Sequence, residues 1–181
     1  MKKMDHRGRV VISISGGLGN QMFQYAMAKN YAVKNNLELY IDKSWYILNS
    51  KQRLFMLDKF NIKENIFPLK NIIIIKIIHI LLPKIARILN ITSFFNFVFD
   101  INVCKVNKAI LGKSKPYWFI GYWQSEKYFL NSKKLLINTF SSTKQVPKEG
   151  FKEKLAIEKA INPICIHVRR GDYLNAKNIN I

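Results

Sequence analysis

Short apolar runs alternate with a longer helical pattern in the first quarter of the chain. Val10–Ser15 is rich in β-branched residues and predicts a buried strand. Gln21–Lys34 is rich in helix formers and apolar almost all round, which predicts a largely covered helix that ends at Asn35-Asn36. Leu37–Ile41 predicts a second strand, ending at Asp42. A strand, a helix and a strand in this order predict a parallel sheet with a right-handed crossover, and therefore an α/β fold.

The middle of the chain contains both helical and strand-like patterns of apolar residues. Trp45–Phe60 has apolar residues at irregular spacing and predicts partial helix, and Ile72–Leu89 predicts a helix that is broken at Pro83. The aromatic run Tyr117–Tyr122 predicts a strand. Ser125–Phe140 predicts a helix, with Ser125 as its N-cap.

The C-terminal part predicts one more helix and one more strand. Lys148–Ile161 is charged and amphipathic, and Ile164–Val168 resembles a short buried strand. Tyr173–Ile181 forms no recognisable element. A sheet of strand–helix units should continue past such a strand, so we expect the second domain to be incomplete. We place an N-terminal, Rossmann-like domain at 1–160 and the start of a second domain at 161–181.

The most apolar segment, Ile72–Leu82, is interrupted by Lys76 and His79 and closed by Pro83. A membrane-spanning helix needs about 20 apolar residues, so this segment is too short to cross a bilayer. Core packing is the preferred interpretation. A helix lying on a membrane surface stays open as the alternative, because basic residues surround the segment.

The chain is strongly basic, with 30 Lys and Arg against 11 Asp and Glu and a formal net charge of +19. Such a balance attracts polyanions, including nucleic acid, anionic lipid and phosphorylated small molecules. Lys, Asn and Ile are all abundant, however, and only six of the 30 cations are Arg. Much of the charge is therefore attributed to compositional drift on solvated surfaces, and charge alone does not identify nucleic acid as a partner.

The two cysteines, Cys104 and Cys165, form no CxxC pair and no cluster with histidine. This pattern indicates neither a disulfide framework nor a zinc site, and it suits a reducing compartment. The first apolar stretch is too short for a secretory signal. We expect a cytoplasmic protein, with peripheral contact to the inner face of the membrane as an extension of that expectation.

Two strand ends carry residues suited to binding an anion. Gly16-Gly17-Leu18-Gly19-Asn20 follows the first predicted strand, and its glycines allow positive φ and close backbone approach. The amides of the helix that follows would attract an anion. The segment matches neither GxxxxGK[ST] nor GxGxxG, and a tight turn without a ligand is the alternative.

The second of these strand ends is His167-Val168-Arg169-Arg170-Gly171-Asp172. Arg169 and Arg170 are adjacent in a chain that otherwise prefers lysine, and arginine binds phosphate oxygens through a planar fork. An ion pair with Asp172 is the alternative. Both can hold at once, with one arginine paired and the other facing a ligand.

Three segments carry a resemblance to a known family. GGLGNQMFQYAMAKNYA at 16–32, GYWQSEKYF at 121–129 and HVRRGDY at 167–173 resemble the bacterial alpha-1,2-fucosyltransferases of glycosyltransferase family 11. The last segment matches the family's H-x-R-R-x-D pattern at every fixed position, and the order and separation of the three also agree. Family members continue well beyond this pattern, so we expect this chain alone to have little or no activity.

The resemblance implies two Rossmann-like domains facing across a cleft, the arrangement called GT-B. It implies that L-fucose passes from GDP-L-fucose to O2 of a terminal galactose on a glycan acceptor, with inversion at the anomeric carbon. It implies that Arg169 and Arg170 hold the donor pyrophosphate and serve catalysis. His167 and Asp172 would line the same pocket, and Gly17, Gly19 and Asn20 would approach the nucleotide sugar.

This mechanism requires charge stabilisation, because negative charge grows on the β-phosphate as GDP leaves. Many glycosyltransferases use a metal ion held by a D-x-D triplet, and no such triplet occurs among the five aspartates of this chain. Two arginines and backbone amides could do the same work, so no metal and no other cofactor is expected. Asp172 is a candidate for the base that takes the acceptor proton, although the neighbouring cations favour a carboxylate held in an ion pair.

A nucleic-acid-binding or membrane-surface-binding protein is the alternative function. The net charge and the aromatic residues Tyr117, Trp118, Tyr122 and Trp123 suggest nucleic acid. These aromatics fall on a predicted strand, so at least half of them should be core residues, and no recognition motif accompanies them. We therefore expect no nucleic-acid partner.

Overall fold

The computed structural model describes residues 8–51, 53–101, 106, 117–141, 150–164 and 166. The chain divides into two compact units, residues 1–144 and 145–181, and each is described by itself. The first unit holds an α/β sheet domain, as predicted. The domain boundary predicted near residue 160 stays a prediction.

The first strand, helix and strand form as the sequence predicts. Strand β1 spans Arg9–Ser13, helix α1 spans Leu18–Lys34 and strand β2 spans Glu38–Asp42. Helix α1 begins three residues earlier than predicted, because helical geometry starts within the glycine-rich turn. It ends where predicted: Asn36 has φ +51°, a left-handed conformation that asparagine tolerates at a helix end.

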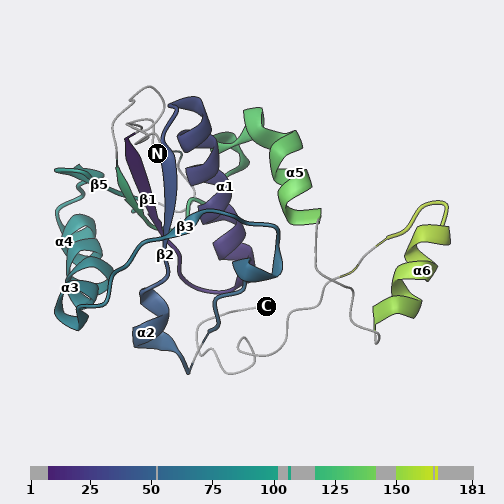
Figure 1. Cartoon of the computed structure of the whole chain (residues 1–181), viewed down its shortest axis with the longest axis horizontal. Coiled ribbons are helices and arrows are strands. Elements are labelled where there is room, and N and C mark those ends of the chain that lie inside the picture. The colour runs from purple at the N-terminus through teal and green to yellow at the C-terminus, as the bar shows by residue number, and fades with distance from the viewer. Residues whose placement is uncertain are drawn as a thin grey trace, which may run out of the picture. The chain divides into compact units, whose positions relative to one another are not determined.

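Six strands form one sheet in the order β3-β2-β1-β6-β5-β4. Figure 1 labels β1, β2, β3 and β5 among them. Strands β1 and β2 pair in parallel, with Val10 opposite Leu39, and β1 also pairs in parallel with β6 (Trp118–Ile120). Short strands complete both sides: β3 (Asn65–Ile66) is parallel to β2, and β5 (Phe97–Phe99) is parallel to β6. Only β4 (Ser93–Phe94) is antiparallel to its neighbour, β5.

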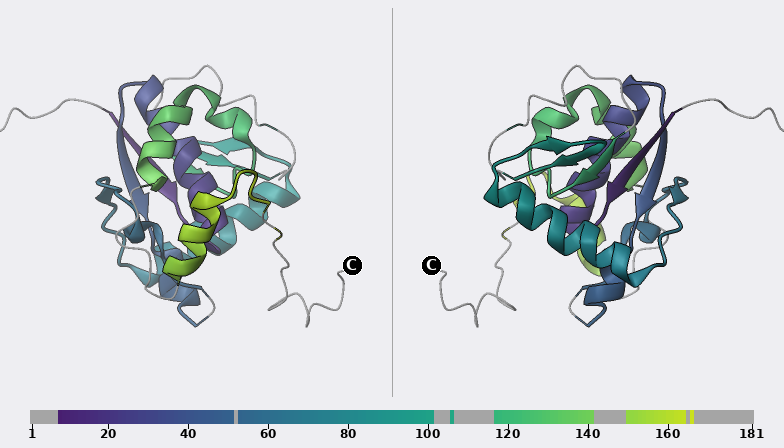
Figure 2. Two further views of the ribbon diagram at one scale, coloured as in Figure 1. Left: turned by 90° about the vertical axis from the view of Figure 1, so that its right-hand side faces the viewer. Right: turned by 90° about the vertical axis from the view of Figure 1, so that its left-hand side faces the viewer.

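Helices cover both faces of this sheet (Figure 2). Helix α1 and helix α5 (Lys133–Ser141) lie on one face, where Ile12, Tyr25, Phe119 and Leu136 join the larger apolar core. The other face carries the helix formed by residues 72–88, with a smaller core that includes Ile78, Ala86, Phe99 and Ile120. The domain is therefore a three-layer α/β/α structure.

The helix over residues 72–88 is continuous rather than broken at Pro83. It consists of α3 (Ile72–Lys76), a π-helical turn η2 (Ile77–Leu81) and α4 (Leu82–Ile88). Proline lacks a backbone N–H and its ring collides with the carbonyl four residues earlier in a regular α-helix. The wider π turn directly before Pro83 relieves this conflict, so the predicted break is wrong.

The expectation that this helix is a core helix is half right. Ile75, Ile78 and Ala86 are buried against the sheet. Most of its remaining isoleucines are exposed, and Ile73 and Ile88 are 66% and 71% accessible. Within the described residues, no helix combines the length and apolarity that crossing a membrane requires.

The remaining elements are short. Where partial helix is predicted over Trp45–Phe60, the described residues form α2 (Trp45–Asn49) and the 3₁₀ turn η1 (Leu57–Lys59) and no other helix. The helix predicted over Ser125–Phe140 begins as two 3₁₀ turns, η4 (Glu126–Tyr128) and η5 (Leu130–Ser132), before α5. Ser125 precedes η4 but its side chain makes no capping hydrogen bond, because the tight 3₁₀ turn replaces the predicted α-helical start.

In the second unit, α6 spans Phe151–Lys159 within the predicted charged helix, and all of its residues are exposed. Ile164 and Ile166 lie in no strand and are 88% and 84% accessible, so the buried strand predicted over Ile164–Val168 does not form at these two described residues. A strand forms only where a neighbouring strand pairs its backbone. Cys104 and Cys165 lie outside the described residues.

Candidate functional site

The parallel strands β1, β2, β5 and β6 all end at one edge of the sheet. Strand β1 sits where the order reverses: β2 and β3 extend to one side of it, and β6, β5 and β4 extend to the other. In open α/β sheets, ligands bind outside the strand ends at such a switch point. The loops that follow β1 and β6 are therefore the candidate site.

The loop after β1 is the glycine-rich turn at residues 16–20. Hydrogen bonds from two side chains fix the carbonyl group of its first residue, Gly16. Gly16 has φ +75°, and a Cβ there would lie 2.8 Å from Nδ2 of Asn20, so the position requires glycine. The Gly16 carbonyl accepts hydrogen bonds from Gln21 Nε2 at 3.1 Å and from the Tyr46 hydroxyl at 3.0 Å. Burial, and secondarily Tyr122, raises the pKa of Tyr46, which keeps this hydroxyl protonated and donating.

The next peptide groups face open space. A Cβ added at Gly17 or at Gly19 would meet no described atom within 4 Å, so internal packing does not explain either glycine. Because the Gly16 carbonyl points inward, the N–H of the same trans peptide, on Gly17, points the opposite way. The first turn of α1 contains no acidic residue, which leaves its positive end uncompensated. This geometry suits an anion.

The structure brings two of the three resembling segments together. Gln124, in the loop after β6, donates from Nε2 to Oδ1 of Asn20 at 2.6 Å. Gln24 of α1 donates to the Gly121 carbonyl at 3.0 Å. Segments that are about a hundred positions apart in the chain therefore form the two walls of one site.

Two buried glutamines that the sequence reading missed fix this arrangement. Gln21 donates to the Leu54 carbonyl at 2.8 Å and accepts from the Met56 amide at 2.8 Å, in addition to its bond with Gly16. Gln24 accepts from the Ser15 amide at 3.0 Å besides donating to Gly121. Both glutamines are fully buried. Their occurrence in a helix that is otherwise apolar almost all round is a sequence signal for buried polar residues with hydrogen-bond partners.

The loop after β6 is held by Asp100, at the end of β5. Oδ2 of Asp100 accepts the Trp123 amide at 2.6 Å. Gly121 has φ +141° and packs so closely on Asp100 that a Cβ there would overlap its side chain. Burial raises the pKa of Asp100, against the opposing effect of hydrogen bonds from the Trp123 and Tyr122 amides. Gly121 and Asp100 thus fix the backbone conformation of the loop that brings Gln124 into hydrogen-bond contact with Asn20.

A second polar cluster lies at the ends of β1 and β2. Asp42 is fully buried and accepts from Ser13 Oγ at 2.8 Å and from the Ser44 amide at 2.9 Å. Nε2 of His79, from η2, lies 3.2 Å from Oδ2 of Asp42 and 2.8 Å from Ser44 Oγ. Burial alone would raise the pKa of Asp42, but hydrogen bonds with His79 and Ser44 outweigh it and hold the pKa below its ordinary value.

This cluster joins the helix at residues 72–88 to the sheet. Trp118 extends it by donating from Nε1 to Ser13 Oγ at 2.8 Å. The sequence assigned His79 no role, because His79 lies 37 positions after Asp42 and no local pattern pairs the two residues. Its burial makes it a positioning element beneath the site rather than part of the ligand-facing surface.

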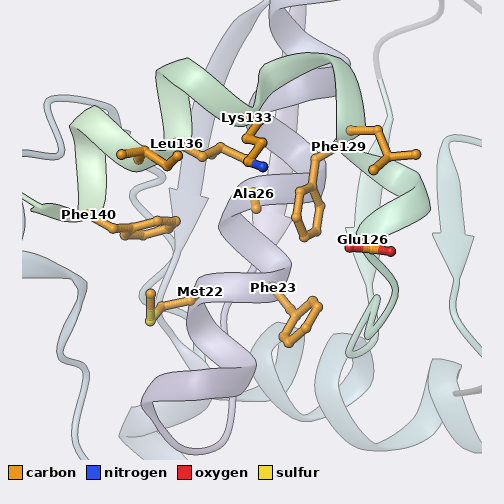
Figure 3. Close-up of a pocket in the computed structure, with 10 residues that line it drawn as sticks. Met22, Phe23, Ala26, Glu126, Phe129, Lys133, Leu136 and Phe140 are labelled. Atoms are coloured by element: carbon orange, nitrogen blue, oxygen red, sulfur yellow. The ribbon is translucent and has the colours of Figure 1, made fainter. Parts of the chain in front are cut away.

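A pocket of about 470 Å³ opens between α1 and the segment from η4 to α5 (Figure 3). Its lining is mostly apolar and includes Met22, Phe23, Phe129 and Phe140. Met22 and Phe23 lie on α1, two and three positions after Asn20, so part of the pocket lining comes from the same helix as the candidate site.

The aromatic residues of the 117–123 segment are mainly core residues, as predicted. Tyr117 and Trp123 are buried, Trp118 is partly buried and Tyr122 is exposed. They pack within the sheet domain rather than forming an exposed aromatic surface that would stack on bases.

The structure places the predicted site residues Gly17, Gly19 and Asn20 together at the β1–α1 turn. The others, His167, Arg169, Arg170 and Asp172, lie outside the described residues, so their placement beside this turn stays a prediction. Among the described residues, no three His, Cys, Asp or Glu side chains are grouped as metal ligands.

Comparison with known proteins gives a family match and a similar relative. The family model for glycosyl transferase family 11 matches residues 9–181. An alpha-1,2-colitosyltransferase of Escherichia coli is 33% identical over 171 residues, which are 92% of this chain and 56% of that protein. The chain therefore spans a little over half the length of this relative. No solved structure matches it. The family match runs from β1 through the glycine-rich turn to the end of the chain, and the chain belongs to glycosyl transferase family 11.

Proposed function

We propose that this protein transfers L-fucose from GDP-L-fucose to O2 of a terminal galactose, with inversion at the anomeric carbon and without a metal ion. The observation that carries the proposal is the family match over residues 9–181, which includes both the β1–α1 turn and the arginine pair. The linkage is supported by the alpha-1,2 specificity in the name of the Escherichia coli relative. That relative transfers colitose, so nucleotide-activated colitose is the second candidate donor.

The turn supplies the first part of the proposed donor site. The open space beside Gly17 and Gly19 gives a diphosphate access to backbone amides at the positive end of α1. Asn20, whose Oδ1 already accepts from Gln124, keeps its amide N–H groups for the nucleotide sugar. Arg169 and Arg170 supply the second part, because guanidinium groups bind diphosphate oxygens in pairs.

In the proposed reaction the acceptor hydroxyl attacks the anomeric carbon from the side opposite to GDP. The bond from that carbon to the diphosphate oxygen breaks, GDP leaves with the electron pair, and the hydroxyl proton passes to a base. Arg169 and Arg170 neutralise the charge that grows on the β-phosphate, while His167 and Asp172 shape the pocket. One hydrogen-bond donor that stabilises developing negative charge lowers the free energy of the transition state by on the order of 3–4 kcal/mol.

We further propose that the sheet domain is the acceptor-side half of a GT-B arrangement, with the donor-binding half beginning near residue 161. Because the chain spans 56% of its relative, the full transfer reaction is proposed for the whole protein, and residues 1–181 alone are expected to turn over little or no substrate. Turnover by residues 1–181 equal to that of the full-length relative would contradict this expectation.

Donor binding is the direct test. Calorimetric titration of the whole protein with GDP should show saturable binding, weakened at least about tenfold by Arg169→Ala, by Arg170→Ala, or by both together. Arg87→Ala, which removes an exposed arginine on α4, is the matched control and should leave the affinity unchanged. Absence of saturable GDP binding, or an equal loss with Arg87→Ala, would overturn the proposal. Competition between GDP-L-fucose and nucleotide-activated colitose then separates the two donors.

A further inference from the structure

The helix at residues 72–88 has two unlike sides. One side carries Ile75, Ile78 and Ala86, which are buried on the sheet. The other carries Ile73, Ile77, Ile80, Leu81 and Ile88, which we call the isoleucine face. The last four lie 4, 7, 8 and 15 positions after Ile73, a spacing that keeps side chains on a common side of a helix.

The isoleucine face is open in the sheet domain. All five of its side chains are exposed, and Ile73, Ile80 and Ile88 are 66%, 55% and 71% accessible. Isolated exposed apolar residues are ordinary on protein surfaces, but a row of large aliphatic side chains along one helix is not. Such a row marks a surface that contacts another apolar phase.

The charged side chains on this helix and on the segments that flank it in sequence are all basic. Between Glu64 and Asp100 the sequence contains no Asp and no Glu. The same stretch contains Lys70, Lys76, Lys84 and Arg87, and all four are exposed. An apolar face with only cations around it fits an anionic bilayer surface, where the apolar side chains enter the headgroup layer and the cations meet lipid phosphates.

The hairpin that follows the helix adds an independent observation. Phe94, at the end of β4, and Phe95, in the turn that leads to β5, are 53% and 85% accessible. Phe95 has φ +49°, a conformation that bulky residues seldom adopt. Exposed aromatic residues of this kind are typical of segments that lie in a membrane interface.

We propose that the helix at residues 72–88 docks the protein on an anionic membrane surface through the isoleucine face. The helix lies parallel to the bilayer, and its length of about 25 Å, at about 1.5 Å per residue, gives an elongated contact. Lys76, Lys84 and Arg87 extend their apolar stems along the same surface and place their charges at the phosphates. This proposal is independent of the proposed function, because it uses neither the glycine-rich turn nor the arginine pair.

Flotation of residues 1–181 with vesicles tests the proposal. The protein should float with phosphatidylcholine vesicles that contain a quarter phosphatidylglycerol, much less with pure phosphatidylcholine, and less at 0.5 M salt. The triple variant Ile73→Ser, Ile80→Ser, Ile88→Ser should reduce the partition coefficient at least about tenfold. Val33→Ser, Ile47→Ser and Ile137→Ser, at similarly exposed positions elsewhere, form the matched control and should leave it unchanged.

A second pair of variants tests how much the basic side chains contribute to membrane binding. Lys76→Gln, Lys84→Gln and Arg87→Gln together should weaken binding by about fivefold for each cation removed. The control removes three exposed lysines elsewhere, by Lys59→Gln, Lys63→Gln and Lys134→Gln, and should have a much smaller effect. Circular dichroism and the urea midpoint confirm that each variant is folded.

Three results would overturn the proposal. The first is failure of the wild-type chain to float with anionic vesicles. The second is equal loss of flotation in the isoleucine variant and its matched control. The third is sedimentation equilibrium that shows a dimer broken by the isoleucine substitutions, together with absent flotation, because a second copy of the chain would then cover the face.

Discussion

Substituting Asp42 by asparagine tests the buried cluster that attaches the helix at residues 72–88 to the sheet. The two side chains have the same shape, so Asp42→Asn creates no cavity and reports on hydrogen bonding alone. The carboxylate accepts from Ser13 and from the Ser44 amide and faces His79, while the side-chain amide can accept at one position only. At least one charge-assisted hydrogen bond is lost, and one donor of the cluster is left to face the new NH₂ group.

The expected loss of stability is substantial. A hydrogen bond to a charged group contributes about 1.5–3 kcal/mol, and a donor left unpaired in a buried site costs about 1–3 kcal/mol. These two contributions overlap, so we expect Asp42→Asn to destabilise the protein by about 2–3 kcal/mol. With a denaturant slope of roughly 2 kcal/mol per molar urea, the midpoint should fall by roughly 1–1.5 M.

The pH dependence gives a second readout with a defined sign. The folded-state pKa of Asp42 is lowered, so its contribution is fully present above the unfolded pKa of about 3.9 and is lost as pH falls through the folded value. The stability difference between wild type and Asp42→Asn should therefore be constant near neutral pH and shrink below about pH 4.

Urea denaturation followed by tryptophan fluorescence measures both quantities. Asp58→Asn is the matched control, because Asp58 is exposed, and it should change the midpoint little. A loss for Asp42→Asn no larger than that of the control, or a difference that grows with acidity, would refute the assignment of Asp42 as a buried, ionised anchor.

Other substitutions test the turn and its supports. Gly16→Ala should destabilise the protein by about 1–3 kcal/mol because of its positive φ and the close Asn20 side chain, while Gly19→Ala should be neutral or slightly stabilising; thermal denaturation distinguishes the two. If the amides of the turn bind the donor, Gly19→Ala should nevertheless weaken GDP binding, which calorimetry measures. Gln24→Leu leaves the Ser15 amide and the Gly121 carbonyl unpaired and should cost about 2–4 kcal/mol in urea denaturation. Gly121→Ala should be strongly destabilising, since its Cβ would overlap Asp100, and a melting temperature equal to that of wild type would contradict the described loop.

The sequence predicts the first strand–helix–strand unit well because local signals agree there. The β-branched run before Gly16, the helix formers after Asn20 and the left-handed residue at Asn36 all indicate the same structure. The glycine-rich turn is predicted for the same reason. Its partner Gln124 is reached through the resemblance of the 121–129 segment, and the hydrogen bond to Asn20 becomes visible only in three dimensions.

What the sequence leaves unpredicted depends on distant contacts. Strands β3, β4 and β5 are two or three residues long, too short for a periodic pattern, and they form because longer neighbours pair with them. The burial of Asp42 beside His79 likewise depends on how a helix docks on a sheet. The arginine pair lies outside the described residues, so the family pattern alone supports its assignment.

The π turn before Pro83 also bears on the history of the family. Geometrically, such a turn is what results when one extra residue is accommodated in an α-helix without displacing its flanks. Homologues that have no proline at this position are therefore expected to align with a single-residue gap between Ile77 and Leu81. An insertion tolerated there would also have changed which side chains of α4 point outward.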